Sequence, residues 1–121
     1  MAFKDNRAKK TEGELFDLLE GKEKITVQEI VTDHPEGVHI TGCTTLKNKK
    51  GDKISAFTFA EDPGKFFFGG VILTKLAEEW INENGGTSKA CSEGLAKEQP
   101  VMKLIQKESA SGNKYTDFEI L

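Results

Sequence analysis

The chain has 121 residues, with 17 basic and 20 acidic side chains, two cysteines and 36% hydrophobic residues. This length predicts a single domain. The net charge of −3 argues against a generally cationic protein that binds nucleic acid or membranes over its whole surface. The composition excludes a collagen, a coiled coil, a disulfide scaffold and a membrane-spanning protein. Eight phenylalanines are an unusually large number for so charged a chain.

The compartment is indicated by the N-terminus and the cysteines. Residues 1–10 are polar and basic and lack the apolar core of a secretory signal. The longest apolar stretch, 66–73, is far shorter than the ~20 residues that cross a bilayer. Cys43 and Cys91 lie far apart without a CxxC motif, so we expect free thiols in a reducing compartment, with a disulfide between them as the alternative. These features predict a cytoplasmic protein without membrane contact.

The N-terminal part divides in two. Residues 1–13 are predicted to form a flexible basic tail, and residues 14–121 a single globular domain. A short amphipathic helix is predicted over 14–20, because its apolar residues cluster on one side and Gly21 is placed to end it. This acidic helix would dock on the protein's own core or on a partner.

Residues 25–34 permit two structures. Apolar residues alternate at the start of the segment, which favours a strand over 25–32. Thr26 and Glu29, however, have the spacing of a capping box, which favours a helix over 27–33. The sequence leaves both open.

The rest of the domain alternates between hairpins and helix. Period-two patterns with many β-branched residues predict strands over 38–46 and 54–59, joined by a lysine-rich turn. A strong apolar stripe predicts a helix over 71–84. A second hairpin follows, with strands over 101–107 and 114–121.

The fold class is therefore α+β, an antiparallel hairpin–helix–hairpin with a short N-terminal helix. If residues 25–32 form a strand, the order of elements becomes that of an OB-like barrel. If they form a helix, a four-stranded antiparallel layer is expected. Residues 87–99 are small and polar and are predicted to hold one or two helical turns.

Motifs for catalysis and metal binding are missing from the sequence. It contains no phosphate-binding loop, dinucleotide fingerprint, nucleophile elbow or zinc-protease motif. His34 and His39 are the only histidines, and no Cys–His set has zinc spacing. We expect a protein that is not an enzyme, with no catalytic residue, no metal and no cofactor.

Lysines concentrate on both predicted hairpins and are the candidate nucleic-acid-binding residues. They are Lys47, Lys49, Lys50 and Lys53 on the first hairpin, and Lys103, Lys107 and Lys114 on the second. If the hairpins are neighbours, these side chains could line one groove for backbone phosphates. The alternative is that lysine-rich tips serve only solubility.

Aromatic side chains supply candidates for stacking on bases. Tyr115 shares its parity with acidic neighbours in the last strand and is predicted to face solvent. Phe57 and Phe59 share one face of their strand, which is either the core or a stacking platform. Consecutive side chains of the run 66–68 point in different directions, so one of its rings should be partly exposed or pack under the helix, with a plain packing role for all three as the alternative.

Two stretches resemble a known group of proteins. They are 68–74, Phe-Gly-Gly-Val-Ile-Leu-Thr, and 111–115, Ser-Gly-Asn-Lys-Tyr. Both look like small accessory proteins of Gram-positive phages and conjugative elements, some of which are OB-like single-stranded DNA-binding proteins. The resemblance covers roughly 38–121, and it implies a role in nucleic-acid binding for Lys114 and Tyr115.

These patterns lead to two functional hypotheses. The first is a non-enzymatic nucleic-acid-binding module of a phage or mobile element, preferably for single-stranded DNA. The alternative is a protein-interaction or inhibitor protein of a mobile element, acting through acidic helix faces and exposed phenylalanines. The partner is then single-stranded nucleic acid or a host or phage protein, and the oligomeric state stays open. The relative position of the two hairpins discriminates between the hypotheses.

Overall fold

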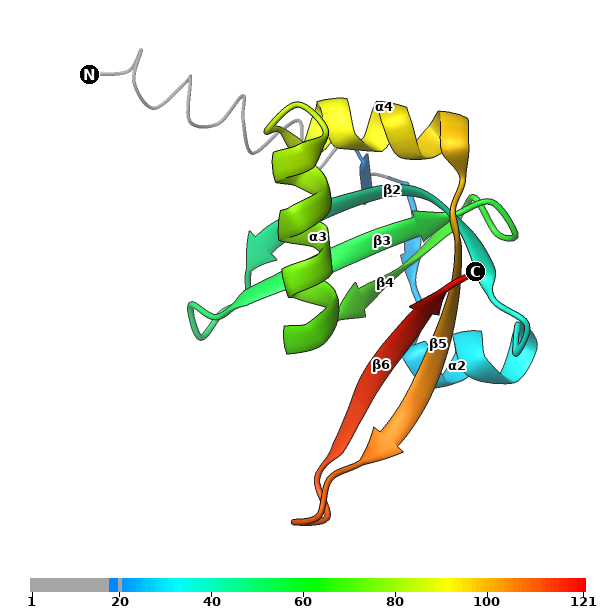
Figure 1. The fold of residues 1–121 in the computed structure, drawn as a ribbon, viewed down its shortest axis with the longest axis vertical. Coiled ribbons are helices and arrows are strands. Elements are labelled where there is room, and N and C mark those ends of the chain that lie inside the picture. The colour runs from blue at the N-terminus through cyan, green and yellow to red at the C-terminus, as the bar shows by residue number, and fades with distance from the viewer. Residues whose placement is uncertain (1–17, 20) are drawn as a thin grey trace.

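The computed structural model describes residues 18, 19 and 21–121. This part of the chain forms a six-stranded, mixed, open sheet with three helices (Figure 1). The strands are β1 (Glu23–Lys24), β2 (Val38–Lys47), β3 (Lys53–Phe59), β4 (Lys65–Gly69), β5 (Val101–Glu108) and β6 (Lys114–Ile120). The helices are α2 (Val27–Asp33), α3 (Val71–Glu83) and α4 (Ser88–Glu98).

The predicted tail over 1–13 lies outside the described residues. So does most of the helix predicted over 14–20, of which the structure describes only Leu18 and Leu19, both in helical conformation. The predictions for these two segments therefore stay predictions.

The ambiguous segment 25–34 forms the helix α2. The side-chain oxygen of Thr26 accepts a hydrogen bond from the backbone N–H of Glu29 at 3.2 Å, which satisfies a free donor of the first turn. Ile30 is buried in the core. The helix prediction is confirmed and the strand over 25–32 is wrong. The OB-like barrel depended on that strand, and the sheet of the described residues is not closed.

Both predicted hairpins are confirmed. β2 and β3 pair antiparallel up to Lys47–Lys53, and β5 and β6 pair antiparallel up to Glu108–Lys114. Two further strands were not predicted. β4 pairs antiparallel with β3, and the two-residue β1 pairs parallel with β4. The sheet order is β1-β4-β3-β2-β5-β6.

The run of three phenylalanines forms the middle of β4. Phe67 is buried opposite Phe57, whereas Phe66 and Phe68 point to the other face and are half-buried. Their rings meet edge to face, with centroids 5.4 Å apart, and the ammonium of Lys24 lies 5.4 Å from the centre of the Phe68 ring. Of the two alternatives expected for this run, partial exposure is the one observed, because Phe66 and Phe68 are each half-buried.

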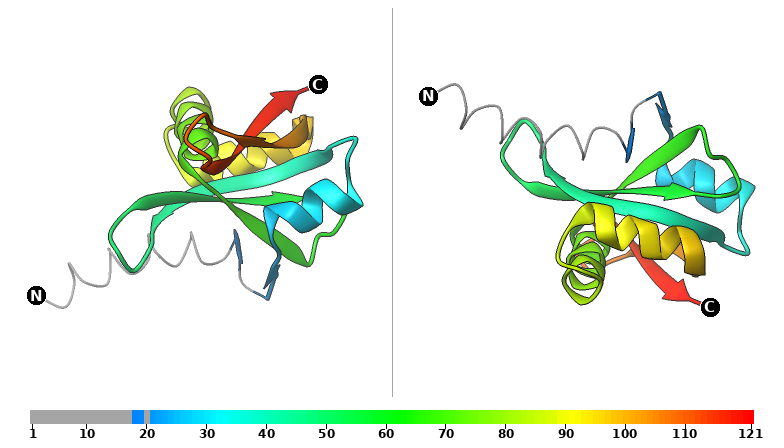
Figure 2. Two further views of the ribbon diagram at one scale, coloured as in Figure 1. Left: turned by 90° about the horizontal axis from the view of Figure 1, so that it is seen from below. Right: turned by 90° about the horizontal axis from the view of Figure 1, so that it is seen from above.

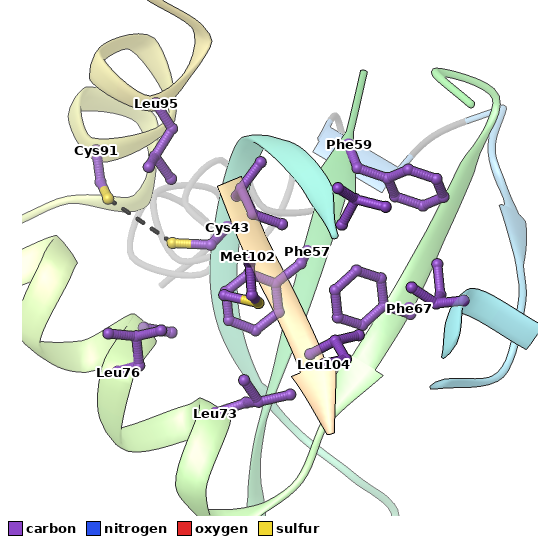
Figure 3. Packing of buried hydrophobic residues seen from close by; sticks show 14 residues of the cluster. Cys43, Phe57, Phe59, Phe67, Leu73, Leu76, Cys91, Leu95, Met102 and Leu104 are labelled. Atoms are coloured by element: carbon purple, nitrogen blue, oxygen red, sulfur yellow. Dashed lines mark hydrogen bonds between the residues drawn. The ribbon is translucent and has the colours of Figure 1, made fainter. Parts of the chain in front are cut away.

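One hydrophobic core lies between the sheet and the helices α3 and α4, which cover the same face (Figures 2 and 3). Phe57 and Phe59 are 0% exposed within it. The Phe57 ring stacks on Phe67 at 5.4 Å and meets Trp80 of α3 edge to face at 6.4 Å. The prediction that Phe57 and Phe59 form a stacking platform for bases is therefore wrong, because both rings are fully buried in the core. The core interpretation of this pair is confirmed.

The pairing between β2 and β5 is very short. It consists of Val38–Met102 and His39–Val101. From this junction β5 continues beyond the start of β2, whereas β2 runs the other way toward Lys47. The two hairpins therefore leave the junction in different directions (Figure 1).

The helix α4 covers the edge that β5 leaves open. The side-chain oxygen of Ser92 accepts a hydrogen bond from the backbone N–H of Cys43 at 3.2 Å and donates one to the Cys43 carbonyl at 3.1 Å. One turn earlier, the hydroxyls of Ser88 and Thr44 lie 2.9 Å apart. These hydroxyls satisfy backbone and side-chain groups of β2 that would otherwise invite pairing with another strand.

Gly69 provides a test of the packing between β4 and α3. A Cβ at this position would lie 2.5 Å from both Leu73 Cβ and Ser55 Oγ. We predict that Gly69→Ala lowers the free energy of unfolding by about 1–3 kcal/mol in urea denaturation, because the core must shift to admit the methyl group.

At Gly94 in α4, a Cβ would meet no other atom within 4 Å. Gly94→Ala is the control, and it should leave stability unchanged or raise it by up to ~1 kcal/mol. Equal stability of Gly69→Ala and wild type would contradict this close approach.

Candidate interaction site

An open pocket of about 150 Å³ lies where α3, α4 and the end of β6 meet. The described residues that line it are Trp80, Asn84, Cys91, Gly94, Leu95, Glu98, Pro100 and Ile120. Pockets that enclose a small molecule usually measure about 300–1,000 Å³. The volume therefore suits one or two side chains of a partner better than a cofactor.

Helical spacing places the lining residues. Cys91 and Leu95 are one turn apart on the buried side of α4, and Gly94 between them has no side chain to fill the pocket. Trp80 and Asn84 are likewise one turn apart at the end of α3. The side-chain amide of Asn84 donates a hydrogen bond to the backbone carbonyl of Trp80 at 2.8 Å, which satisfies an acceptor in the last turn of the helix.

The segment that follows α4 completes the lining of the pocket with Pro100. Gln99 adopts a left-handed conformation with φ 47°, and the carbonyl of the following Pro100 accepts a hydrogen bond from the Ile40 backbone N–H at 2.9 Å. Across the pocket, Ile120 is 44% exposed, and the next residue, Leu121, is 67% exposed. The pocket thus opens onto an apolar patch at the end of β6.

The charged residue that lines the pocket is acidic. Glu98 is exposed at the rim, and none of the described lining residues is basic. The two helices are less one-sided: of the three glutamates of α3, Glu78 is paired with Lys53, and α4 carries two lysines beside its two glutamates. The attraction for a positively charged segment therefore rests mainly on Glu98.

The lysines of the first hairpin are exposed around its tip. Lys53 is already paired, with its ammonium 3.0 Å from a carboxylate oxygen of Glu78 on α3. Among the described residues, no carboxylate lies within ion-pair distance of Lys47, Lys49 or Lys50. These three form the basic part of the tip.

The lysines of the second hairpin are balanced by acids. Lys103 and Lys114 are direct cross-strand neighbours of Glu119 and Glu108. The ammonium of Lys107 donates a hydrogen bond to Asp117 at 2.8 Å. The pKa of Lys107 is raised by this hydrogen bond and by the charge of Asp117, and the same bond lowers the pKa of Asp117. The second hairpin therefore offers little unpaired positive charge.

The candidate nucleic-acid residues do not converge. At ~3.3 Å per residue, Lys47 lies about 30 Å along β2 from the junction at Val38, whereas Lys107 lies about 17 Å along β5 on the other side. The expected groove between the hairpins is therefore not formed. Tyr115 is 40% exposed, as its parity predicts, but it stands across from Lys107, away from the tip of the first hairpin.

Residues 18, 19 and 21–121 contain no group of three or more His, Cys, Asp or Glu side chains that could hold a metal ion. None of the helices in this part of the chain is long and apolar enough to span a membrane. The chain was also compared with protein-family models, curated proteins and solved structures, and no match was found.

Glu61 clamps His39 at the junction of β2 and β5. One carboxylate oxygen accepts a hydrogen bond from the His39 backbone N–H at 2.8 Å, and the other lies 2.7 Å from the ring nitrogen Nδ1. Burial raises the pKa of Glu61, but the hydrogen bonds from the ring and backbone of His39 outweigh it. The pKa of Glu61 therefore lies below its ordinary value of 4.5.

This clamp makes the stability of the fold depend on pH. Because the pKa of Glu61 is lower in the folded state, its ionised form stabilises the fold above the ordinary pKa, and this contribution disappears as pH falls through the lowered value. We predict that Glu61→Gln reduces the free energy of unfolding by about 1–2 kcal/mol at about pH 7, and by less at about pH 3. Urea denaturation at both pH values measures the difference.

Glu79→Gln, on the exposed side of α3, is the control and should change the free energy of unfolding at neither pH. A loss of the same size at both pH values would contradict the role of the ionised carboxylate.

Proposed function

We propose that this protein is a non-enzymatic interaction module that binds a partner protein through the pocket between α3, α4 and β6. The observation that carries the proposal is that one pocket is lined by a half-buried tryptophan, Trp80, by the exposed apolar side chain of Ile120 and by the carboxylate of Glu98. Tryptophans in partly formed pockets with apolar neighbours are the usual energetic centres of protein interfaces.

The chemistry of the pocket defines the partner. An apolar side chain of the partner would enter between Leu95 and Ile120, and a neighbouring lysine or arginine would pair with Glu98. The charge of Glu98 also favours the approach of such a basic segment. A segment of this kind is short and requires only one or two buried side chains, in keeping with the volume of about 150 Å³.

This proposal follows the interaction hypothesis drawn from the sequence, with one change. The phenylalanines of β4 do not line the pocket: Phe67 is buried, and the half-buried Phe66 and Phe68 point to the other face of their strand. The setting in a phage or mobile element rests on the resemblance alone, and the cytoplasmic location rests on the sequence.

A library of short random peptides displayed on phage tests the proposal. We predict that selection on the full-length protein enriches peptides with an apolar residue beside lysine or arginine. Synthetic copies should change the fluorescence of Trp80, which is the single tryptophan of the chain. Ile120→Ser should weaken binding of these peptides about tenfold, because it removes the apolar side chain from the patch without adding a charge that would attract a basic peptide.

Val71→Ser is the matched control. Val71 is also an exposed apolar residue, 75% accessible, but it lies at the opposite end of α3 from Trp80. Its replacement should leave peptide affinity unchanged. Failure to enrich peptides that combine basic and apolar residues, or an equal loss of peptide affinity in both variants, would contradict the proposed site.

A second candidate function is local binding of nucleic acid by the tip of the first hairpin. The support is the group Lys47, Lys49 and Lys50, which lies away from the acidic helix faces apart from the contact of Lys53 with Glu78. The tip strand segments carry no exposed aromatic side chain, so binding would rest on phosphate contacts and would be weak and independent of sequence.

Fluorescence anisotropy with a labelled single strand of ~30 nucleotides measures this activity. We predict weak binding in about 50 mM salt, because only a few phosphates are neutralised, and a further loss of roughly tenfold by about 200 mM salt. Lys49→Glu/Lys50→Glu should abolish it. Lys107→Glu/Lys114→Glu, which removes two lysines of the balanced hairpin, should have little effect. An equal loss from both double variants would instead support the groove between the hairpins, and no binding in low salt would exclude nucleic acid.

A further inference from the structure

The two cysteines meet in the core at the contact between β2 and α4. Cys43 Sγ and Cys91 Sγ lie 3.7 Å apart, and both thiols are free (Figure 3). Their exposed fractions are 0% and 1%. A disulfide bond measures about 2.05 Å, so the sulfur atoms need to approach by less than ~2 Å.

The two thiols differ in their access to reagents. Cys91 lines the wall of the pocket, whereas Cys43 lies behind it on β2. Burial raises the pKa of Cys43, as does the neighbouring Cys91, and burial also raises the pKa of Cys91. Reaction therefore waits for opening of the pocket wall, and Cys91 is the thiol that a small reagent meets first.

We propose that Cys43 and Cys91 form a reversible disulfide that ties α4 to the edge of β2 and fixes the wall of the pocket. The oxidant is a low-molecular-weight disulfide such as oxidised glutathione. The Cys91 thiolate attacks it, forms a mixed disulfide and releases one thiol, which takes the proton that Cys91 lost. The Cys43 thiolate then attacks the sulfur of Cys91, closes the internal bond and releases the second thiol. The protein loses two hydrogen atoms with their electrons, and the small disulfide gains them.

The position of this bond determines its effect. α4 is held on the edge of β2 by Ser92, which bonds both backbone groups of Cys43, and by the contact of Ser88 with Thr44. The disulfide adds a covalent link in the middle of that contact. It also closes a long loop of the chain, which restricts the unfolded state. The effect on partner binding rests on the function proposed above, whereas formation of the disulfide does not.

Mass spectrometry of the full-length protein after incubation with oxidised glutathione tests the proposal. Wild type should lose two hydrogen atoms and yield a peptide that links Cys43 to Cys91, and dithiothreitol should reverse both changes. Cys43→Ala should stop at the mixed disulfide and carry one glutathione on Cys91. Cys91→Ala should stay unmodified over the same time. The proposal is overturned if wild type keeps two free thiols or forms disulfide-linked dimers instead of the internal bond. It is also overturned if glutathione modifies Cys43 in Cys91→Ala faster than it modifies Cys91 in Cys43→Ala.

Two readouts on the same samples report the locking of α4. Trp80 lines the pocket together with Cys91, so its fluorescence should change on oxidation of wild type and recover on reduction. The oxidised protein should also unfold at higher urea concentration than the reduced protein. An internal disulfide without either change would show that α4 is not locked. None of these measurements uses a peptide, so failure of peptide binding and failure of the disulfide are separate results.

Discussion

The second hairpin joins the rest of the sheet through two residue pairs, Val38–Met102 and His39–Val101. Because β5 then diverges, most of β2 has no strand on that side. An open edge of this length invites pairing with other chains. The chain meets this constraint with α4, whose Ser92 hydroxyl bonds both backbone groups of Cys43. The return from α4 to β5 passes through Pro100, and the pocket lies at that return.

The same junction distributes the charges of the molecule. It directs the lysines of the first hairpin to one end of the sheet and those of the second hairpin to another. At the second hairpin Lys107 is bonded to Asp117, whereas Lys49 and Lys50 stand at the exposed tip of the first. The pocket carries its charge on Glu98 of α4, whereas Glu78 of α3 contacts Lys53 beside that tip. A net charge of −3 is thus the sum of surfaces that suit different partners.

Local patterns explain what could be predicted. The capping pair Thr26–Glu29 specifies the start of α2 by one hydrogen bond, and period-two alternation specifies both hairpins. β4 was missed because an apolar run such as 66–68, with both faces partly covered, lacks the alternation of a half-buried strand. α4 was underestimated because Cys91 and Leu95 are its only buried residues, which leaves a weak apolar stripe.

The sequence by itself determined which residues share a face of an element: Phe57 with Phe59, and Tyr115 on the exposed side of its strand. Only the tertiary structure decided which face became the core, how far apart the two lysine groups lie, and that Cys43 meets Cys91. The reason is physical. Side-chain periodicity follows from the local backbone geometry, whereas the partner and register of an element depend on packing among residues distant in sequence. A pocket or a pair of thiols formed by two elements therefore cannot be recognised from the residue pattern of either element alone.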